Sequence, residues 1–170
     1  MKYLITGVTG SGKSTIAGEL RNRGRVVYDT DSENLARWED DEGKPAPSEH
    51  HPSEEWLKHH HWNINEDKLQ KILKDHENIG LCGTASNLKN FFSLFDKIFV
   101  LVIDQPELAE RLNNRTNNPF GKSAEEQADI FSWHKWYEES LIKQGAQTID
   151  ATLPLNEVVE LILKDSDDNN

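Results

Sequence analysis

Short apolar runs alternate along the chain with segments whose apolar residues recur at the spacing of a helix. The apolar runs predict buried strands, and the clearest of them is residues 97–104, where Ile98 to Ile103 is unbroken. Strands that alternate with helices form a parallel sheet with helices on both of its faces. The pattern therefore predicts a three-layer α/β fold whose strands are residues 2–6, 25–28, 78–83, 97–104 and 147–150.

Capping residues mark where several helices begin. Ser123 and Glu126 form a capping box for one long helix, and Pro106 stands in the first turn of another. Residues 39–52 are polar and are interrupted by Gly43 and prolines, so we expect an irregular or mobile loop there. Further helices are expected after Gly12, through Asn34 to Trp38, from a Ser53 cap, from an Asn63 or Asn65 cap, and after Pro154.

The length and composition predict one domain without a membrane span. We expect that domain to cover residues 1–164, and we expect the acidic residues 165–170 to be a disordered tail. A single cysteine, Cys82, excludes an internal disulfide framework and is typical of a reducing compartment. No apolar run approaches the ~20 residues of a membrane helix, and the chain starts on a core strand, so we expect a cytoplasmic protein.

The charge restricts the classes of partner. The net charge is −11 at pH 7 and the isoelectric point is about 5.0. Surfaces that follow a phosphate backbone or an anionic membrane are basic. We therefore expect no nucleic-acid or membrane partner, which also disfavours a kinase that acts on nucleic-acid ends.

The segment from Gly7 to Thr15 follows the first predicted strand and satisfies the phosphate-binding pattern G-x-x-x-x-G-K-[ST]. Inward backbone N–H groups and the positive end of a helix dipole would meet a nucleotide's phosphates here. Lys13 should reach the β- and γ-phosphates, and the Ser14 hydroxyl should bind Mg²⁺. A glycine-rich turn can match by chance, but the flanking strand and helix favour nucleotide binding. The candidate nucleotide-binding residues are Gly7, Thr9, Gly10, Ser11, Gly12, Lys13, Ser14 and Thr15.

Polar residues also follow the second and third predicted strands, where ligands of parallel sheets bind. Asp29 and Asp31 are alternate residues of an extended segment, so both can point to one side. Such carboxylates can hold the water shell of a metal or accept a proton from an attacking hydroxyl, although they can also simply cap the next helix. After the third strand, Thr84, Ser86 and Asn87 offer neutral hydrogen bonds, and Ser86 can equally serve as a helix cap.

Two arginines precede a turn-rich loop. Arg111 and Arg115 are four residues apart and share a helix face, and a lid is expected over residues 115–123. Arginines in this position can move onto a transferring phosphoryl group and stabilise its charge. The alternative is a pair of surface arginines bonded to Glu107 or Glu110.

Histidines and tryptophans are concentrated in residues 50–62. The spacing of the histidines matches no zinc pattern, so we expect a solvated segment rather than a metal site. Trp56 and Trp62 are candidates for the apolar wall of an acceptor pocket, or for the core. The histidines are His50, His51, His59, His60 and His61.

Gly7 to Thr15, followed by an Arg-x-x-x-Arg helix and a lid-like loop, resembles the adenylate-kinase-like group of small P-loop kinases. The triplet Asp29-Thr30-Asp31 is similar to that of shikimate kinases and, more loosely, of gluconate kinases. The resemblance implies a P-loop NTPase fold with strand order 2-3-1-4-5, an acceptor-binding insertion at about residues 32–76 and the lid. It also implies ATP and Mg²⁺ as cosubstrates and phosphoryl transfer to a small acceptor.

The same resemblance assigns roles to individual residues. Asp29 would be the carboxylate on the metal side, Asp31 would bind the acceptor, and Arg115 would be the arginine of the lid. Thr152 and Pro154 belong to the segment that lies against adenine in this group.

The chain departs from these families where they bind the acceptor. Nucleoside monophosphate kinases usually carry an arginine after the third strand, but residues 83–87 contain none. Shikimate kinases usually show a Gly-Gly-Gly run there and an arginine for the substrate carboxylate. Between residues 32 and 62 the only cations are Arg37, Lys44 and Lys58, among many carboxylates. We therefore expect a neutral or weakly anionic acceptor, such as a nucleoside, a sugar or a hydroxylated metabolite.

Two alternative functions stay open. One is a nucleoside monophosphate kinase. The other is an ATP-binding or ATPase regulatory protein that acts on a protein partner, although Leu81-Cys82-Gly83 lacks the acidic residue that usually positions water in such ATPases. We expect a monomer or a homodimer.

Overall fold

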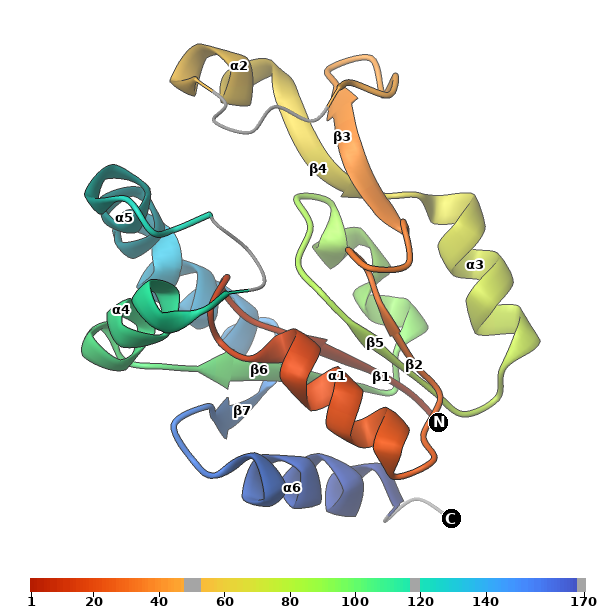
Figure 1. Ribbon diagram of the computed structural model, residues 1–170. Helices are drawn as coiled ribbons and strands as arrows, with labels where there is room; N and C mark the ends of the chain where they lie inside the picture. The colour runs from red at the N-terminus through yellow and green to blue at the C-terminus, as the bar shows by residue number, and fades with distance from the viewer. Residues whose placement is uncertain (48–52, 117–119, 168–170) are drawn as a thin grey trace.

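Five parallel strands form the central sheet of the computed structural model, which describes residues 1–47, 53–116 and 120–167 (Figure 1). The order across the sheet is β2-β5-β1-β6-β7. Counted along the chain within this sheet, the order is 2-3-1-4-5, so the predicted α/β topology is confirmed. The strands are β1 (Lys2–Thr6), β2 (Val27–Asp29), β5 (Ile79–Cys82), β6 (Lys97–Val102) and β7 (Gln147–Asp150).

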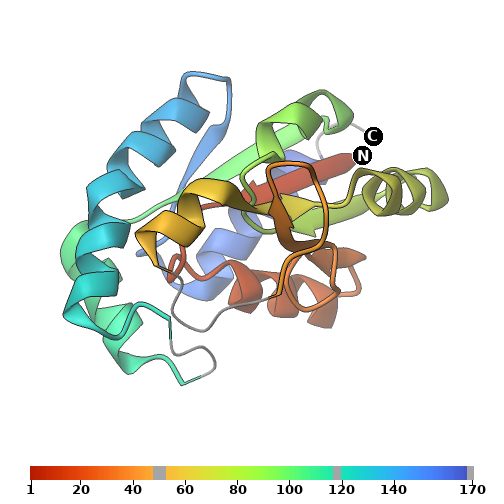
Figure 2. The ribbon, with the colours of Figure 1, turned by 90° about the horizontal axis from the view of Figure 1, so that it is seen from above.

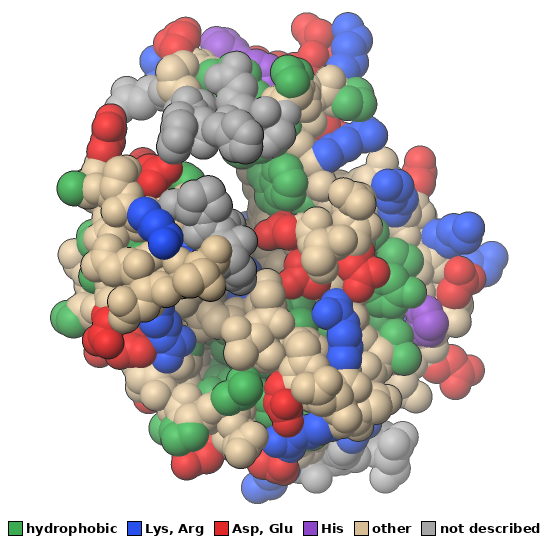
Figure 3. All heavy atoms as spheres, viewed as in Figure 1, with side chains coloured by type: hydrophobic (Ala, Val, Ile, Leu, Met, Phe, Trp, Pro, Cys, Tyr) green, Lys and Arg blue, Asp and Glu red, His purple; other side chains and the backbone are tan. Residues whose placement is uncertain are grey.

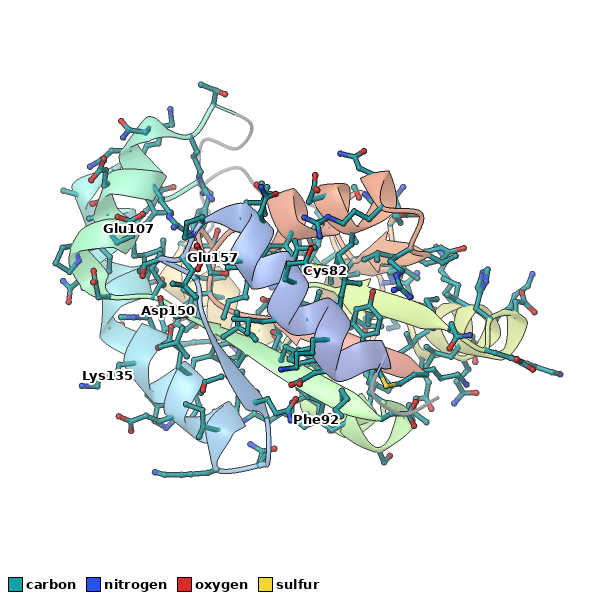
Figure 4. All side chains as sticks on the ribbon, turned by 90° about the horizontal axis from the view of Figure 1, so that it is seen from below. Cys82, Phe92, Glu107, Lys135, Asp150 and Glu157 are labelled. Atoms are coloured by element: carbon teal, nitrogen blue, oxygen red, sulfur yellow. The ribbon has the colours of Figure 1, made fainter. Side chains whose placement is uncertain are left out.

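Helices cover both faces of this sheet because its inner strands, β5, β1 and β6, are buried on both faces. In β1, Tyr3 and Ile5 pack against α1 (Lys13–Asn22) and α6 (Leu155–Asp167), which lie side by side in Figure 4. Leu4 points to the opposite face, which holds a second apolar cluster. Burying a leucine of this kind contributes about 1.5–3 kcal/mol. That second face is covered by α3 (Glu66–Asp75), the 3-10 helix η1 (Leu88–Leu94) and α5 (Ala124–Ile142).

Side-chain caps begin the helices where the sequence predicts them. Ser53 and Asn65 accept hydrogen bonds from the first turns of α2 (Glu54–His59) and α3, and Ser123 forms its capping box with Glu126 at the start of α5. Asp104 caps α4 (Gln105–Asn114). At the other end of the chain, α6 continues to Asp167, so the predicted tail starts too early, and residues 168–170 lie outside the described part. No helix within the described ranges is long and apolar enough to cross a membrane.

A β-hairpin stands above the carboxyl ends of the sheet strands, as Figure 2 shows from above. It pairs β3 (Ala36–Asp40) antiparallel with β4 (His60–Ile64), with Trp38 opposite Trp62. The expected helix from Asn34 to Trp38 is therefore wrong. Part of the expected loop 39–52 is also ordered, because Asp40 ends a strand and its carboxylate accepts hydrogen bonds from Glu42 N and Lys44 N. The expectation for residues 48–52 lies outside the described residues.

Candidate functional site

The loop between β1 and α1 is shaped by glycines with positive φ, among them Gly10 and Gly12. Gly10 has a φ of 85°, and a Cβ there would lie 2.9 Å from Leu108 Cδ1 and 3.0 Å from Leu112 Cδ2. Gly12 has a φ of 100° and caps α1, which starts at Lys13. The unpaired N–H groups of the first helical turn therefore face the space above the loop. This backbone is built to hold an anion.

Lys13 lies in the centre of this loop. Its ammonium donates to the carbonyl oxygens of Gly7 and Val8, each at 2.8 Å, which uses two of its three N–H groups. Burial lowers the pKa of Lys13 below its ordinary value, while the nearby carboxylates of Asp31 and Asp29 oppose that shift. The charge is thus held among oxygen atoms at the place where the motif predicts the β- and γ-phosphates.

The two aspartates after β2 do different things. Asp29 is 5% exposed, and its Oδ1 accepts hydrogen bonds from Asp31 N at 3.0 Å and from Ser32 N at 3.2 Å. It fixes the turn that follows the strand. Asp31 is exposed and lines the pocket above the phosphate loop. Of the two carboxylates, Asp31 therefore faces the pocket, and Asp29 supports the turn that carries it.

Arg111 joins three segments around the same pocket. Its Nε donates to Glu107 Oε1 at 2.8 Å, one terminal nitrogen donates to Ala151 O at 2.7 Å, and the other donates to Ser11 O at 3.3 Å. Glu107 and Asp150, which precedes Ala151, lie at the same end of the molecule in Figure 4. The guanidinium thus links the phosphate loop to the segment after β7.

Arg115 follows α4 and reaches across the mouth of the phosphate loop. One terminal nitrogen donates to Thr9 Oγ1 at 3.1 Å. Among the described residues, its Nε and its other terminal nitrogen have no hydrogen-bond partner, although both atoms are buried. Burial lowers the pKa of Arg115, and Glu126 opposes that shift. Buried N–H groups of a cation are costly when unpaired, so this guanidinium is suited to an anion at the loop.

A pocket of about 520 Å³ connects these groups. It brings together most of the predicted nucleotide residues with both arginines and Asp31. Of the described residues expected at the site, Gly7, Asp29, Thr152 and Pro154 are not in its lining. The Thr152 hydroxyl instead donates to Asp150 Oδ1 at 2.6 Å. The lining is Thr9, Gly10, Ser11, Gly12, Lys13, Ser14, Thr15, Ile16, Asp31, Arg111, Asn114, Arg115, Ala151, Leu153, Leu155 and Val158.

The residues present fit a nucleotide and a divalent cation. Ala151, Leu153, Leu155 and Val158 give one end of the pocket an apolar slot for a base, while the loop and the cations occupy the other end. Ser11 Oγ is buried without a hydrogen-bond partner among the described residues, at the centre of the loop. Mg²⁺ prefers oxygen ligands, which the motif's serine hydroxyl and the aspartates after β2 would supply directly or through water.

The end of β5 connects the phosphate loop to the hairpin. Thr84 Oγ1 donates to Gly7 O at 2.6 Å, and Ser86 N donates to Trp62 O at 2.8 Å. Asn87 receives a hydrogen bond from Ile64 N and donates one to Ile64 O, both at 2.9 Å. Asn87 thus acts as a clamp that holds the hairpin to the segment after β5. The sequence pattern predicts only a neutral hydrogen-bonding group there and does not reveal this structural role.

Helix α5 contributes polar groups that sequence reasoning missed. The Tyr137 hydroxyl lies 3.0 Å from Thr6 Oγ1, at the end of β1, and burial raises its pKa. The next residue, Glu138, accepts a hydrogen bond at Oε1 from Ile103 N at 3.2 Å, and His134 Nε2, one turn earlier, lies 3.0 Å from Ile103 O. No local pattern identifies these groups, because their partners are 31 or more residues away.

The described histidines of the His-rich segment bond to hairpin groups. His59 and His61 lie 2.7 and 3.2 Å from the two carboxylate oxygens of Asp41. His60 stacks on Trp56 with a centroid distance of 4.0 Å. Over the described residues, no three His, Cys, Asp or Glu side chains are grouped so that they could hold a metal ion. His50 and His51 lie outside those residues.

Comparisons with known proteins agree with this geometry. A family model described as "AAA domain" matches residues 4–132. Among solved structures, a deoxyadenosine kinase from M. mycoides is 16% identical, with a TM-score of 0.63 and coverage of 97% of this chain and 98% of the other. A shikimate kinase from Bacteroides thetaiotaomicron is 14% identical, with a TM-score of 0.60 over 96% and 97% of the two chains.

A third similar structure is a sugar kinase from Janibacter sp. HTCC2649. It is 15% identical, with a TM-score of 0.55 over 98% of this chain and 95% of that one. No protein with a curated description matches the sequence. The resemblance to small P-loop kinases is therefore confirmed for the fold, over nearly the whole of both chains.

Proposed function

The chain belongs to the AAA-domain family, and we propose that it is a small-molecule kinase that transfers the γ-phosphoryl group of ATP to a hydroxyl of its acceptor. One observation carries this proposal. Arg115, which bonds to Thr9 of the phosphate loop, has two buried guanidinium nitrogens without a hydrogen-bond partner among the described residues, and the centre of that loop already holds Lys13. Two cations that flank one anion site are suited to phosphoryl transfer, in which charge spreads over the transferred group's equatorial oxygens.

The remaining residues would orient the reaction. The loop and Lys13 hold the phosphates, and Ser14, with Asp29 through water, would hold Mg²⁺, which neutralises phosphate charge when it is bound. Asp31 faces the pocket, so it would orient the acceptor hydroxyl and accept its proton. Arg111 fixes the segment after β7 against the loop and exposes its guanidinium to the pocket. Most of the catalysis would come from positioning and charge stabilisation.

A nucleoside, a sugar or another hydroxylated metabolite is the proposed acceptor. The similar solved structures include a deoxyadenosine kinase, a shikimate kinase and a sugar kinase, which supports a small acceptor. The nucleoside monophosphate kinase and the ATPase that serves a protein partner are the alternatives. The cytoplasmic location, the monomer or homodimer, and the absence of nucleic-acid and membrane partners stay predictions.

The test measures ADP release from Mg·ATP against a panel of acceptors, with mass spectrometry of the product. Lys13→Met is the blank. Arg115→Ala should lower kcat at least about 100-fold, because arginines in this role contribute 10³–10⁵. Arg23→Ala is the matched control, since Arg23 pairs with Glu19 at the far end of α1.

Two results would contradict the proposal. A loss of no more than twofold in Arg115→Ala would remove the role of that guanidinium. Acceptor-independent ADP release that disappears in Lys13→Met, with no phosphorylated product, would favour the ATPase alternative.

A further inference from the structure

Three indoles and an imidazole form one aromatic cluster on the hairpin. Trp38 and Trp62 face each other across β3 and β4, with ring centroids 5.5 Å apart. Trp56 of α2 packs edge-on against Trp38 at 4.9 Å, and His60 stacks on Trp56 at 4.0 Å. We refer to these four residues as the aromatic wall. None of these four side chains is fully buried, so part of each remains accessible to a ligand.

The aromatic wall belongs to the hairpin above the sheet edge that carries the phosphate loop, and none of its four residues lines the pocket of about 520 Å³. Alternation along the strands places Trp38 and Trp62 on the same hairpin face as Ala36 and Ile64, whose side chains are buried at its base. The helix α2, which supplies Trp56, lies on the side of the hairpin toward α5 in Figures 1 and 2. Figure 3 shows hydrophobic side chains on the hairpin side of the hollow between the hairpin and the α4–α5 side.

The wall begins close to the groups that would perform the transfer. Trp62 O accepts a hydrogen bond from Ser86 N, and Thr84, two residues earlier, is bonded to Gly7 O of the phosphate loop. On the other strand, Ala36 N donates to the carbonyl oxygen of Thr30, the residue before Asp31. Both hairpin strands are therefore fixed at the edge of the reaction space, so a small molecule whose hydroxyl reaches Asp31 would extend along the wall.

Charge restricts what this molecule can be. Within the described parts of residues 31–64, every Lys and Arg side chain is paired with a carboxylate. The pairs are Arg37 with Glu39 at 2.9 Å, Lys44 with Glu42 at 3.3 Å and Lys58 with Glu55 at 2.8 Å. A phosphate or carboxylate on the acceptor would thus meet the Asp31 carboxylate, and within these described residues it would find no Lys or Arg side chain free of a carboxylate to offset its desolvation.

We propose, on the basis of the kinase function proposed above, that the acceptor is an uncharged molecule in which a flat aromatic ring carries the hydroxyl-bearing part. The ring packs against Trp62 and Trp38, and the hydroxyl lies at Asp31. Aromatic side chains can hold flat rings by stacking, without base-specific hydrogen bonds, as they do in proteins that bind single-stranded nucleic acids. A nucleoside is uncharged and carries its hydroxyls on a sugar joined to a flat aromatic base. A saturated sugar acid has no aromatic ring and carries a negative charge.

The experiment compares acceptors that differ in one feature. Adenosine and thymidine carry an aromatic base, ribose is the pentose without that base, AMP adds a phosphate, pyridoxine is an aromatic alcohol, and gluconate and shikimate are acids without an aromatic ring. At least one ring-bearing neutral acceptor should exceed ribose, AMP and the acids at least 100-fold in kcat/KM. Direct binding of each acceptor by calorimetry, with a non-hydrolysable ATP analogue and Mg²⁺ present, gives a second readout.

Variants then test the wall itself. Trp62→Leu should raise the KM of the ring-bearing acceptor at least 10-fold and leave kcat and the KM of ATP within threefold, and Trp62→Phe should recover most of this loss. Trp136→Leu is the matched control, because that indole on α5 is 65% exposed and lies beside Lys89. Thermal unfolding of each variant confirms that it is folded.

Four outcomes decide against the proposal in distinguishable ways. Preferential transfer to ribose, gluconate or shikimate overturns the ring inference and leaves the kinase function intact. Preferential transfer to AMP overturns the inference of an uncharged acceptor and favours the nucleoside monophosphate kinase alternative. A folded Trp62→Leu with the same acceptor KM as Trp136→Leu overturns the role of the wall alone. Binding of Mg·ATP without transfer to any acceptor overturns the kinase function, and with it the inference.

Discussion

Replacing Asn87 should loosen the hairpin from the sheet. The amide of Asn87 bonds both backbone groups of Ile64 at 2.9 Å, and Ile64 is 2% exposed. In Asn87→Ala both groups lose their partner. Each buried polar group left unpaired costs about 1–3 kcal/mol. Since water can reach one of them after a small movement, we expect the free energy of unfolding to fall by about 2–4 kcal/mol.

Asn87→Asp should be at least as damaging as the alanine. The carboxylate can still accept from Ile64 N, but it presents an oxygen where the amide donated to Ile64 O. Urea denaturation followed by tryptophan fluorescence measures both changes. Asn90→Ala is the control, because Asn90 is exposed on the same 3-10 helix. A loss below about 0.5 kcal/mol, within the range of ordinary surface substitutions, would refute the clamp.

Three further changes test other parts of the structure. Gly83→Ala would place a Cβ 2.0 Å from Thr30 Oγ1, so we expect urea denaturation to show a loss of about 1–3 kcal/mol, and an unchanged stability would refute that close approach. Burial raises the pKa of Glu138, so the bound proton stabilises the fold fully below the ordinary pKa of 4.5, and that stabilisation is lost as pH rises through the raised value. Glu138→Gln keeps an oxygen that accepts from Ile103 N but has no carboxyl group to lose a proton. Denaturation measured from pH 4.5 to 8 should therefore show the stability of this variant rising relative to the parent. Stability curves that stay parallel over this pH range would contradict the raised pKa of Glu138. Burial also raises the pKa of Cys82 to about 12, so iodoacetamide at pH 8 should label it, by mass spectrometry, only after unfolding.

Local sequence signals were sufficient for the sheet and the nucleotide side of the site. The unbroken apolar run ending at Ile103 could only be an interior strand, and the caps at Ser53, Asn65 and Ser123 act within one helical turn. The phosphate loop was predictable for the same reason, since its glycines, lysine and serine are contiguous. In each case the residues that determine the structure are neighbours in the chain.

The hairpin was not predictable in this way, because its pairing joins segments that are far apart. Leu35 and Trp38 are three residues apart, which also fits a helix, and only the pairing with Trp62 decides for a strand. A period-two signal was nevertheless present, because the apolar Ala36 and Trp38 alternate with the charged Arg37 and Glu39. The contacts of Arg111 and Asn87 are equally non-local, and no pattern within either segment reveals them.

Asp29 and Asp31 show that a motif can identify a site without telling which of its residues plays which part. Both carboxylates follow β2, and the sequence allowed either one to be the base. The turn decides between them, because the backbone N–H groups of Asp31 and Ser32 occupy one Asp29 oxygen. Gly83 reinforces this choice, since its missing Cβ lets the Thr30 side chain pack against the end of β5. The end of β5 thus bonds both to Thr30, the residue before Asp31, and through Thr84 to the phosphate loop, so the proposed acceptor and nucleotide sites share one edge of the sheet.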